Sequence, residues 1–350
     1  MNSFSQLWSN FSQFDNHRMI LRIEDKKIGL SGYIAIHRGG IKRAAFGATR
    51  MWPYESEKQI VIDVLKLSKI MTYKVAMAGL PYGGAKAVLQ FNRQSGSRLA
   101  VLSRYAEIVD IFNGRFITGA DVGINTADLH LMLKKTKHMV GTQSDPVWYT
   151  GMGVYSGIQV CLKEVFGSED TTGRSFAIQG LGKTGTSILS NVYKTAGAIY
   201  VSDINKDAVK KIHELYPKVK VVPFTAIASQ EVDVFCPCAL SDAINENNID
   251  KFRCRIIAGS ANAQLESDLL GDQLYKKEIL YAPDYVINAG GLIAVADEYE
   301  NKKSDKDRVK KKVIGIKNTL RTIFRLSKQK HLPASRVSDM LAEDKFKKVQ

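Results

Sequence analysis

The stretches SFAIQGLGKTG (residues 175–185) and AIYVSD (residues 198–203) decide the fold of the second half of the chain. The first is a short apolar run that leads into three glycines, and the second is an apolar run that ends in an acid. Short apolar runs between turn residues are typical of strands buried on both faces of a parallel sheet. The segment between them has a helix-like pattern, so these residues predict a strand–helix–strand unit.

Further apolar runs extend this pattern toward the C-terminus. We expect strands at residues 219–222, 232–236, 255–258 and 285–288. Because the runs alternate with helical stretches, they predict a doubly wound α/β (Rossmann) domain with a parallel sheet.

Gly180, Gly182 and Gly185 have the spacing of a dinucleotide-binding loop between a strand and a helix. In such a loop the first glycine permits a tight turn, the second lets a pyrophosphate approach the backbone, and the third lets the helix pack on the strand. The N-terminus of the helix then faces the phosphates. We therefore expect the loop residues to hold the cofactor: Gly180, Leu181, Gly182, Lys183, Thr184 and Gly185.

Asp203 ends the second strand, about twenty residues beyond the glycines. A carboxylate in that position accepts a hydrogen bond from the ribose 2′-hydroxyl and repels a 2′-phosphate. The sequence therefore predicts NAD rather than NADP as the cofactor, and it indicates an oxidoreductase.

The rest of the chain mixes strands and helices. Alternation predicts a strand at residues 28–37. Apolar residues three and four positions apart predict helices at residues 57–71, 99–112, 150–165 and 308–327.

A chain of 350 residues exceeds the usual size of one hydrophobic core, so we expect two domains. An α/β domain is expected in residues 1–145 and the parallel-sheet domain in residues 146–300. Helices in residues 301–350 should return across the cleft and pack on the first domain.

Composition argues against several classes of protein. The chain has no apolar run of about eighteen residues, the length that would suggest a membrane span. Its first residues lack the basic and apolar segments of a secretory signal, and its four scattered cysteines do not suggest a disulfide framework. We therefore expect a cytoplasmic protein.

The net charge of +15 raises the question of nucleic-acid binding. Much of the excess lies in segments such as residues 302–312 and 345–348, and no basic stretch is interleaved with aromatic residues. A solvated basic face, or attraction of an anionic substrate or cofactor, explains the charge without a nucleic-acid partner.

The sequence offers no metal site. Cys236 and Cys238 are two sulfurs one residue apart, without a second pair or a suitably spaced histidine. We therefore interpret them as packing residues at a strand end and expect no metal.

Three other stretches concentrate glycine, lysine and acid: MTYK (71–74), GGAK (83–86) and ITGADVG (117–123). Most lysines are solvated and most loop acids cap helices, so residue type alone leaves a purely structural role open. Lys86 differs because Gly83, Gly84 and Ala85 cannot cover its stem, and we expect a bend there that brings the backbone close to another element.

These stretches resemble the Glu/Leu/Phe/Val amino-acid dehydrogenases, most closely the leucine enzymes. The resemblance covers residues 19–345. It runs in order through GATRMWPY (47–54), the three stretches above, TGMGVY (150–155), the glycine loop, DINK (203–206), PCAL (237–240), AGSAN (258–262) and APDYVINAGG (282–291).

The resemblance implies a role for each of several polar residues. Lys74 is similar to the lysine that pairs with the substrate α-carboxylate, and Lys86 to the general base that activates water. The ammonium of Lys74 and burial would both lower the pKa of Lys86. Asp121 resembles the proton acceptor for the substrate amine, and Thr150 and Asn262 resemble contacts to nicotinamide and ribose.

The resemblance also implies an apolar substrate pocket. Glutamate enzymes carry a lysine where this chain has Phe46, and a second substrate carboxylate could not be buried cheaply without that lysine. The other implied pocket residues are apolar or small: Gly47, Met71, Gly119, Leu292 and Val295.

The implied activity is NAD-dependent oxidative deamination of a branched-chain L-amino acid to a 2-oxo acid and ammonia, by a homo-oligomer. Two alternatives stay open at this point. The enzyme could prefer an aromatic amino acid, with Phe46 stacking on the substrate ring. A catalytically silent NAD-binding protein is the other alternative, although such a protein has no reason to keep Lys74, Lys86 and Asp121 together.

Overall fold

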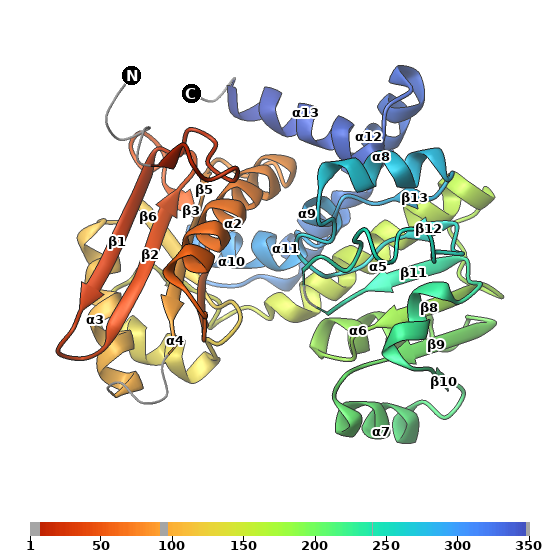
Figure 1. Cartoon of the computed structure of the whole chain (residues 1–350), viewed down its shortest axis with the longest axis horizontal. Coiled ribbons are helices and arrows are strands. Elements are labelled where there is room, and N and C mark those ends of the chain that lie inside the picture. The colour runs from red at the N-terminus through yellow and green to blue at the C-terminus, as the bar shows by residue number, and fades with distance from the viewer. Residues whose placement is uncertain (1–7, 92–96, 240, 348–350) are drawn as a thin grey trace. The chain divides into compact units, whose positions relative to one another are not determined.

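The computed structural model describes residues 8–91, 97–239 and 241–347, which form two compact units (Figure 1). Unit 1 comprises Met1–Ser144, Val295–Ser304 and Lys345–Gln350, and unit 2 comprises Asp145–Ala294 and Asp305–Asp344. Both units are α/β, which confirms the predicted fold class. Some residues named in the predictions from sequence lie outside the described residues: the first seven, Leu240 and Lys348.

Unit 1 contains a mixed sheet. Its strand order is β1 (Met19–Asp25), β2 (Leu30–Ile36), β5 (Gly83–Gln90), β3 (Ala45–Phe46), β6 (Phe116–Gly119) and β7 (Met139–Val140). The β1–β2 and β2–β5 pairs are antiparallel, and the other pairs are parallel, including that of β4 (Thr49–Trp52) with β5. The strand predicted at residues 28–37 is therefore confirmed as β2.

Three helices of unit 1 are α2 (Glu57–Met77), α3 (Arg98–Ile111) and α4 (Thr126–Leu133). The first two confirm predicted helices, although α2 continues beyond the predicted end at residue 71. Ser56 caps α2 by accepting a hydrogen bond from the Gln59 N–H. Ile60 and Val64 of α2 pack with Val88 of β5 in one apolar cluster, which fixes this helix against the strand.

Unit 2 contains a six-stranded sheet in which every pair is parallel (green to cyan in Figure 1). The order is β10 (Lys220–Val221), β9 (Ala198–Ser202), β8 (Ser175–Gln179), β11 (Val234–Pro237), β12 (Ile256–Ile257) and β13 (Leu280–Tyr281). After β8 the chain adds β9 and β10 on one side of that strand and then β11, β12 and β13 on the other. The carboxyl end of β8 is therefore the point where the strand order reverses, and ligands bind at such points in doubly wound sheets.

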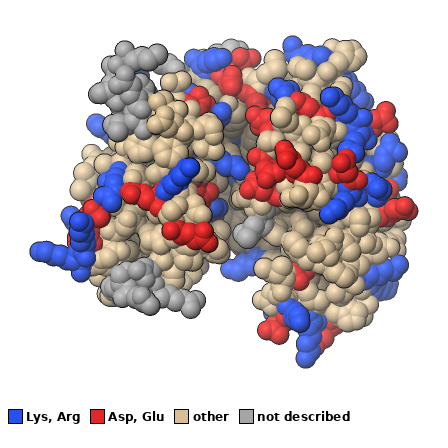
Figure 2. Space-filling model, viewed as in Figure 1, with Lys and Arg blue, Asp and Glu red and all other residues tan. Residues whose placement is uncertain are grey.

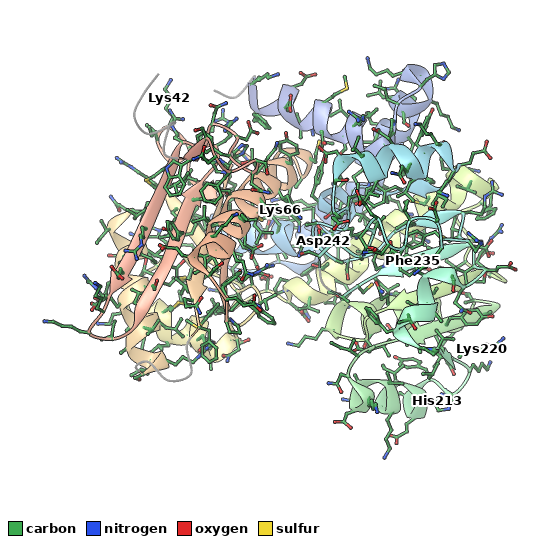
Figure 3. The ribbon with its side chains drawn as sticks, in the orientation of Figure 1. Lys42, Lys66, His213, Lys220, Phe235 and Asp242 are labelled. Atoms are coloured by element: carbon green, nitrogen blue, oxygen red, sulfur yellow. The ribbon has the colours of Figure 1, made fainter. Side chains whose placement is uncertain are left out.

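Helical segments cover the strands of unit 2. They include α5 (Pro146–Phe166), α6 (Lys183–Val192), α7 (Lys206–Leu215), η1 (Phe224–Ser229) and α8 (Asp268–Lys276). Phe235 of β11, labelled in Figure 3, packs with Ile227 of η1 and Leu270 of α8 in one buried cluster.

One strand predicted for unit 2 is wrong. Of residues 285–288, the first three belong to helix α9 (Asp284–Ile287) and Asn288 is its C-cap, and the sixth strand is β13. The N–H groups of Val286 and Ile287 both donate to the Pro283 carbonyl, so a proline begins this helix. A short apolar run has no period that distinguishes a strand from a buried helix, and that ambiguity explains the error.

Two helix boundaries also differ from the prediction. Helix α5 begins at Pro146 with Asp145 as its N-cap, so Thr150 lies inside the helix. Residues 308–327 belong to two helices, α11 (Lys306–Ile314) and α12 (Ile316–Lys330), which meet at Gly315. Glycine is a poor helix former, and this position separates the two helices.

Charged side chains of both signs are spread over both units on the face drawn in Figure 2. In the part of the chain that the structure describes, no helix is long and apolar enough to cross a membrane.

Glu298 forms hydrogen bonds with residues 141–144, where the first segment of unit 1 ends. It lies on α10 (Gly290–Asn301), a helix that starts in unit 2 and continues in unit 1, and it is buried. Its carboxylate accepts hydrogen bonds from the N–H groups of Gly141 (3.0 Å), Thr142 (3.2 Å) and Ser144 (2.9 Å) and from the Ser144 hydroxyl (2.6 Å). Bonds to a charged acceptor are stronger than neutral ones, so this one side chain fixes residues 141–144.

We expect Glu298→Ala to lower the free energy of unfolding by about 2–4 kcal/mol, because several partly buried N–H groups lose their shared acceptor. Urea denaturation followed by circular dichroism measures the change. Glu214→Ala, which removes an exposed carboxylate on α7, should change it little. Equal stability of the two variants would contradict this role for Glu298.

Candidate active site

The GGAK stretch forms the start of β5, not the bend that the sequence suggested. The expected close approach of another element is present. A Cβ atom at Gly84 would lie 2.0 Å from the Thr72 nitrogen on α2, and one at Gly83 would lie 1.8 Å from the Arg38 oxygen. Only glycine fits at these two positions, so α2 lies directly on β5. Lys74 of α2 and Lys86 of β5 therefore belong to elements in contact, and both lysines are buried.

Lys86 forms a buried ion pair with Asp121. The Lys86 Nζ lies 2.5 Å from Asp121 Oδ2, and the two side chains are 6% and 17% exposed. Asp121 follows β6, and its N–H donates to the Thr49 carbonyl at 3.0 Å. Lys86 and Asp121 were proposed as catalytic from sequence, and the structure brings them together.

Sequence reasoning did not identify Arg50, which also binds Asp121. Arg50 Nε donates to Asp121 Oδ2 at 3.1 Å, and Nη1 donates to Asp63 Oδ2 at 2.9 Å. The Tyr54 hydroxyl donates to the same Asp63 oxygen. Arg50 and Tyr54 lie in the GATRMWPY stretch that carried the family resemblance, but no spacing rule connects them with Asp63 on α2 or with Asp121.

Burial lowers the pKa of Lys86, because a charged ammonium is poorly solvated there. The Asp121 charge opposes this effect, and the Arg50 charge adds to it. Burial raises the pKa of Asp121, but the charges of Lys86 and Arg50 outweigh it and hold that pKa below its usual range. From the sequence, Lys74 was expected to supply a like charge near Lys86, and in the structure Arg50 also supplies such a charge.

Phe46 and two glycines among the predicted pocket residues lie on neighbouring strands of unit 1. Phe46 is fully buried, and its ring centroid lies 5.2 Å from that of Tyr82 and 6.3 Å from that of Tyr299. The Gly47 N–H donates to the Ile117 carbonyl of β6 at 2.8 Å, and Gly119 ends β6. Tyr82 and Tyr299 were missed, since neither lies in a stretch that the resemblance used.

The remaining predicted pocket residues lie on helices. Met71 is half-buried on α2, three residues before Lys74. Leu292 and Val295 lie on α10, Leu292 in unit 2 and Val295 in unit 1. The structure thus places Phe46, Gly47, Met71, Gly119 and Val295 in the same unit as Lys86, and Leu292 in the other.

The glycine loop of unit 2 has the geometry that dinucleotide binding requires. Gly180 follows β8 with a φ of +99°, a conformation that favours glycine. A Cβ at Gly185 would lie 2.0 Å from the Gly180 oxygen, so the third glycine lets α6 approach the loop. At Gly182, the N-cap of α6, a Cβ would meet nothing within 4 Å, which leaves the backbone open to a phosphate. Lys183 and Thr184 begin the helix, whose N-terminus attracts anions.

Asp203 is joined to this loop by direct hydrogen bonds. Its Oδ2 accepts from the Leu181 N–H at 2.6 Å, and its Oδ1 accepts from the Asn205 N–H at 2.8 Å. Each carboxylate oxygen has a second lone pair, so the side chain retains the capacity to accept from a ribose hydroxyl. The residues of the loop and Asp203 together fit a bound dinucleotide.

Thr150 and Asn262 lie in the same unit as the glycine loop and are held by neighbouring residues. The Thr150 hydroxyl donates to the Pro146 carbonyl at 2.8 Å and accepts from the Gly291 N–H at 3.1 Å. Asn262 Oδ1 accepts from Asn288 Nδ2 at 3.0 Å. Asn288, buried and absent from the predicted site, therefore orients Asn262.

Among the described residues, no group of three or more His, Cys, Asp and Glu side chains is arranged to hold a metal ion. Cys236 and Cys238 are buried free thiols in and after β11. His213, labelled in Figure 3, is exposed on α7.

Comparison with known families agrees with this geometry. Residues 17–138 match the Glu/Leu/Phe/Val dehydrogenase dimerisation domain, and residues 141–343 match the Glutamate/Leucine/Phenylalanine/Valine dehydrogenase family. The chain belongs to the Glu/Leu/Phe/Val dehydrogenase family. It is therefore an amino-acid dehydrogenase, an oxidoreductase that acts on a CH–NH2 group.

Relatives in this family act on different amino acids. The chain is 35% identical to a leucine dehydrogenase of Geobacillus stearothermophilus over 97% of its length and 93% of the relative. It is 40% identical to a phenylalanine dehydrogenase of Bacillus thermotolerans, over 82% and 78% of the two chains. The crystal structure of L-tryptophan dehydrogenase from Nostoc punctiforme superposes with a TM-score of 0.79, at 37% identity over 95% and 96% of the two chains.

The pH dependence of kcat/KM should change when the positive charge of Arg50 is removed. Arg50→Gln removes a cation that lowers the pKa of Lys86, so that pKa rises. Only a neutral amine accepts a proton, so the acidic limb of the kcat/KM profile should move to higher pH. Arg22→Gln, at an exposed ion pair on β1, should leave the limb in place. An unchanged limb in Arg50→Gln would show that Arg50 does not tune the reacting base.

Proposed function

We propose that the chain catalyses the NAD-dependent oxidative deamination of an apolar L-amino acid, with branched-chain amino acids as the preferred class. The products are the 2-oxo acid, ammonia and NADH. Two observations carry the proposal: the Lys86–Asp121 ion pair, and the buried aromatic side chain of Phe46 on β3, the strand between β5 and β6. Bound NAD supplies the acceptor for the hydride that leaves the substrate Cα.

The residues of unit 1 would perform the proton transfers. Lys74 pairs with the substrate α-carboxylate as a fixed cation. Asp121, held as a carboxylate by Lys86 and Arg50, accepts the proton that the substrate ammonium must lose before hydride leaves. Lys86 in its neutral form then takes a proton from the water that attacks the resulting iminium carbon, and returning that proton to the nitrogen lets the C–N bond break and ammonia leave as the carbonyl forms. Burial of Lys86 supports this role, because it makes the neutral form accessible at lower pH.

The pocket residues support an apolar substrate. Phe46 stands where glutamate enzymes of the family carry a lysine, and it is packed between Tyr82 and Tyr299. Gly47, Met71, Gly119, Leu292 and Val295 add no charge. A substrate carboxylate would lose its hydration there without gaining a partner, so glutamate is disfavoured.

An aromatic substrate is the second candidate. The half-buried rings of Tyr82 and Tyr299, which both pack near Phe46, offer edge and face contacts to a substrate ring. The 40% identity to a phenylalanine dehydrogenase and the 38% identity to an L-tryptophan dehydrogenase agree with this candidate. A catalytically silent protein is the least supported alternative, because two charges buried at 2.5 Å are costly to keep without a use.

The cofactor is proposed to be NAD rather than NADP. Asp203 lies against the glycine loop through its bond to Leu181, and a 2′-phosphate would meet this carboxylate. Gly180–Gly185, Thr150 and Asn262 complete the proposed cofactor contacts.

We also propose a homo-oligomer that works in the cytoplasm. The match to a dimerisation domain supports self-association. All four cysteines are free and buried, in agreement with a reducing compartment.

The proposed activity is tested by NADH formation with each of the twenty amino acids. We expect valine, leucine or isoleucine to give the highest kcat/KM and glutamate to give almost none. Lys86→Ala should lower kcat by about two to four orders of magnitude, the usual range for a positioned acid–base group. Phenylalanine or tryptophan as the best substrate would select the aromatic candidate. Glutamate as the best substrate, or a nearly unchanged kcat in Lys86→Ala, would refute the proposed pocket or the proposed base, respectively.

Cofactor choice is tested separately with Asp203→Ala. The wild type should use NAD far better than NADP, and the variant should narrow that preference by about tenfold or more, since the repelling charge is gone. Asp207→Ala, which removes an exposed carboxylate from the first turn of α7, is the matched control. Equal use of both cofactors by the wild type would rule out the role assigned to Asp203.

A further inference from the structure

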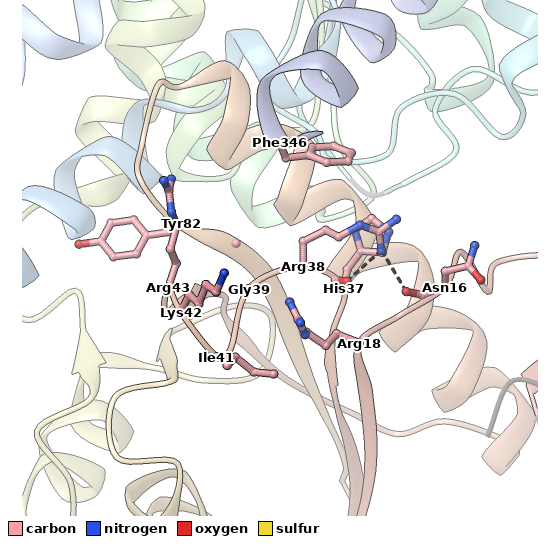
Figure 4. A pocket seen from close by; sticks show the side chains of 11 residues that line it. Asn16, Arg18, His37, Arg38, Gly39, Ile41, Lys42, Arg43, Tyr82 and Phe346 are labelled. Atoms are coloured by element: carbon pink, nitrogen blue, oxygen red, sulfur yellow. Dashed lines mark hydrogen bonds between the residues drawn. The ribbon is translucent and has the colours of Figure 1, made fainter. Parts of the chain in front are cut away.

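A basic cavity lies in unit 1, with a volume of about 570 Å³ (Figure 4). Its walls come from the segment before β1, the end of β2, the loop of residues 39–43, the start of β5 and the end of α13 (Ala334–Lys347). All lining residues belong to unit 1, whereas the glycine loop and Asp203 belong to unit 2. The cavity is therefore separate from the proposed cofactor contacts.

The lining of this cavity is basic. It includes Arg18, Arg38, Lys42 and Arg43 and no acidic residue. Arg18, Lys42 and Arg43 are exposed, and none of these three makes an ion pair with any residue in the described ranges. In Figure 4 the ends of the Arg18 and Lys42 side chains approach the same space from different segments. Cations left without counterions in a hollow raise the local concentration of anions.

Two carboxylates are bonded to residues that line the cavity, and both are engaged in those bonds. Asp15 lies 3.3 Å from His37, 3.2 Å from Lys69 and 3.9 Å from Arg38. Glu300 accepts from the Tyr82 hydroxyl at 3.1 Å. Arg38 is occupied as well, since its Nη1 donates to the carbonyls of Asp15, Asn16 and His37. The unpaired charge is thus that of Arg18, Lys42 and Arg43.

Backbone geometry, not ion pairing, positions the loop cations. Gly39 and Gly40 have φ values of +89° and +81°, and the Gly40 N–H donates to the Arg43 carbonyl at 2.7 Å. A Cβ at Gly39 would lie 2.9 Å from the Gly83 Cα, so the loop packs directly on the start of β5. The fold keeps Lys42 and Arg43 at the cavity although their charges repel each other.

We propose that this cavity binds a small molecule that carries one or more phosphate groups. Guanidinium groups match phosphate oxygens in geometry, and an ammonium adds a third charge. The cavity has the size of ordinary small-molecule sites and exceeds the room that inorganic phosphate needs. Ile41, 63% exposed, and the Phe346 ring offer apolar surface to an organic portion of the ligand.

Binding is measured by isothermal titration calorimetry on the full chain with saturating NAD, which keeps the probes out of the dinucleotide loop. The probes are inorganic pyrophosphate and fructose 1,6-bisphosphate. We expect saturable binding of one molecule per chain. Tighter binding of the sugar bisphosphate would identify an organic phosphate as the ligand class, and tighter binding of pyrophosphate would identify a free anion.

The double variant Arg18→Gln/Arg43→Gln should raise Kd about tenfold or more, and Lys42→Gln alone should raise it less. The matched control is Lys26→Gln/Lys27→Gln, which removes two exposed cations from the β1–β2 turn of the same unit and should leave Kd unchanged. Thermal unfolding verifies that each variant is folded. The proposal is overturned if the wild type shows no saturable binding, or if the control weakens binding as much as the double variant.

Discussion

The buried ion pair between Lys86 and Asp121 is the constraint on which the chemistry of unit 1 depends. Removing two opposite charges from water is expensive, and their mutual attraction compensates only when the geometry is good and further partners are present. Arg50 supplies such a partner by binding Asp121, and Asp63 balances Arg50 in turn. The result is a carboxylate that stays charged and an ammonium whose proton is held less firmly. Both properties suit a site that must move protons.

Close packing of glycines makes this ion pair possible. Gly83 and Gly84 let the β5 backbone touch Arg38 and Thr72, and α2 then covers the strand that carries Lys86. An alanine at Gly84 would separate the helix from the strand, and one at Gly83 would displace the backbone of Arg38 and Gly39. The same tight packing at Gly39 positions the cations of the basic cavity, so two features of unit 1 derive from backbone contacts at the start of β5.

In unit 2 the backbone N–H groups of the glycine loop are proposed to face the phosphates of the cofactor. The loop after β8 turns at Gly180 and enters α6 at Gly182, and Asp203 is fixed to it by the Leu181 N–H. Asp203 is therefore part of the loop structure as well as a candidate contact for a ribose. If Asp203 also contacts the ribose, as proposed, cofactor choice is coupled to the shape of the loop.

The sequence by itself determined the two α/β domains and the glycine loop with Asp203, because local spacing and residue type record them directly. Its resemblance to the family singled out Lys86 and Asp121 as candidate residues, and the structure showed that they form an ion pair. The sequence did not determine that residues 284–287 are helical, that Arg50 and Asp63 complete the charged cluster, or that Tyr82 and Tyr299 enclose Phe46. Each of those depends on residues that are far apart in the chain or on a run too short to show a period. Only the tertiary structure decides them, because burial and charge pairing arise from neighbours in space.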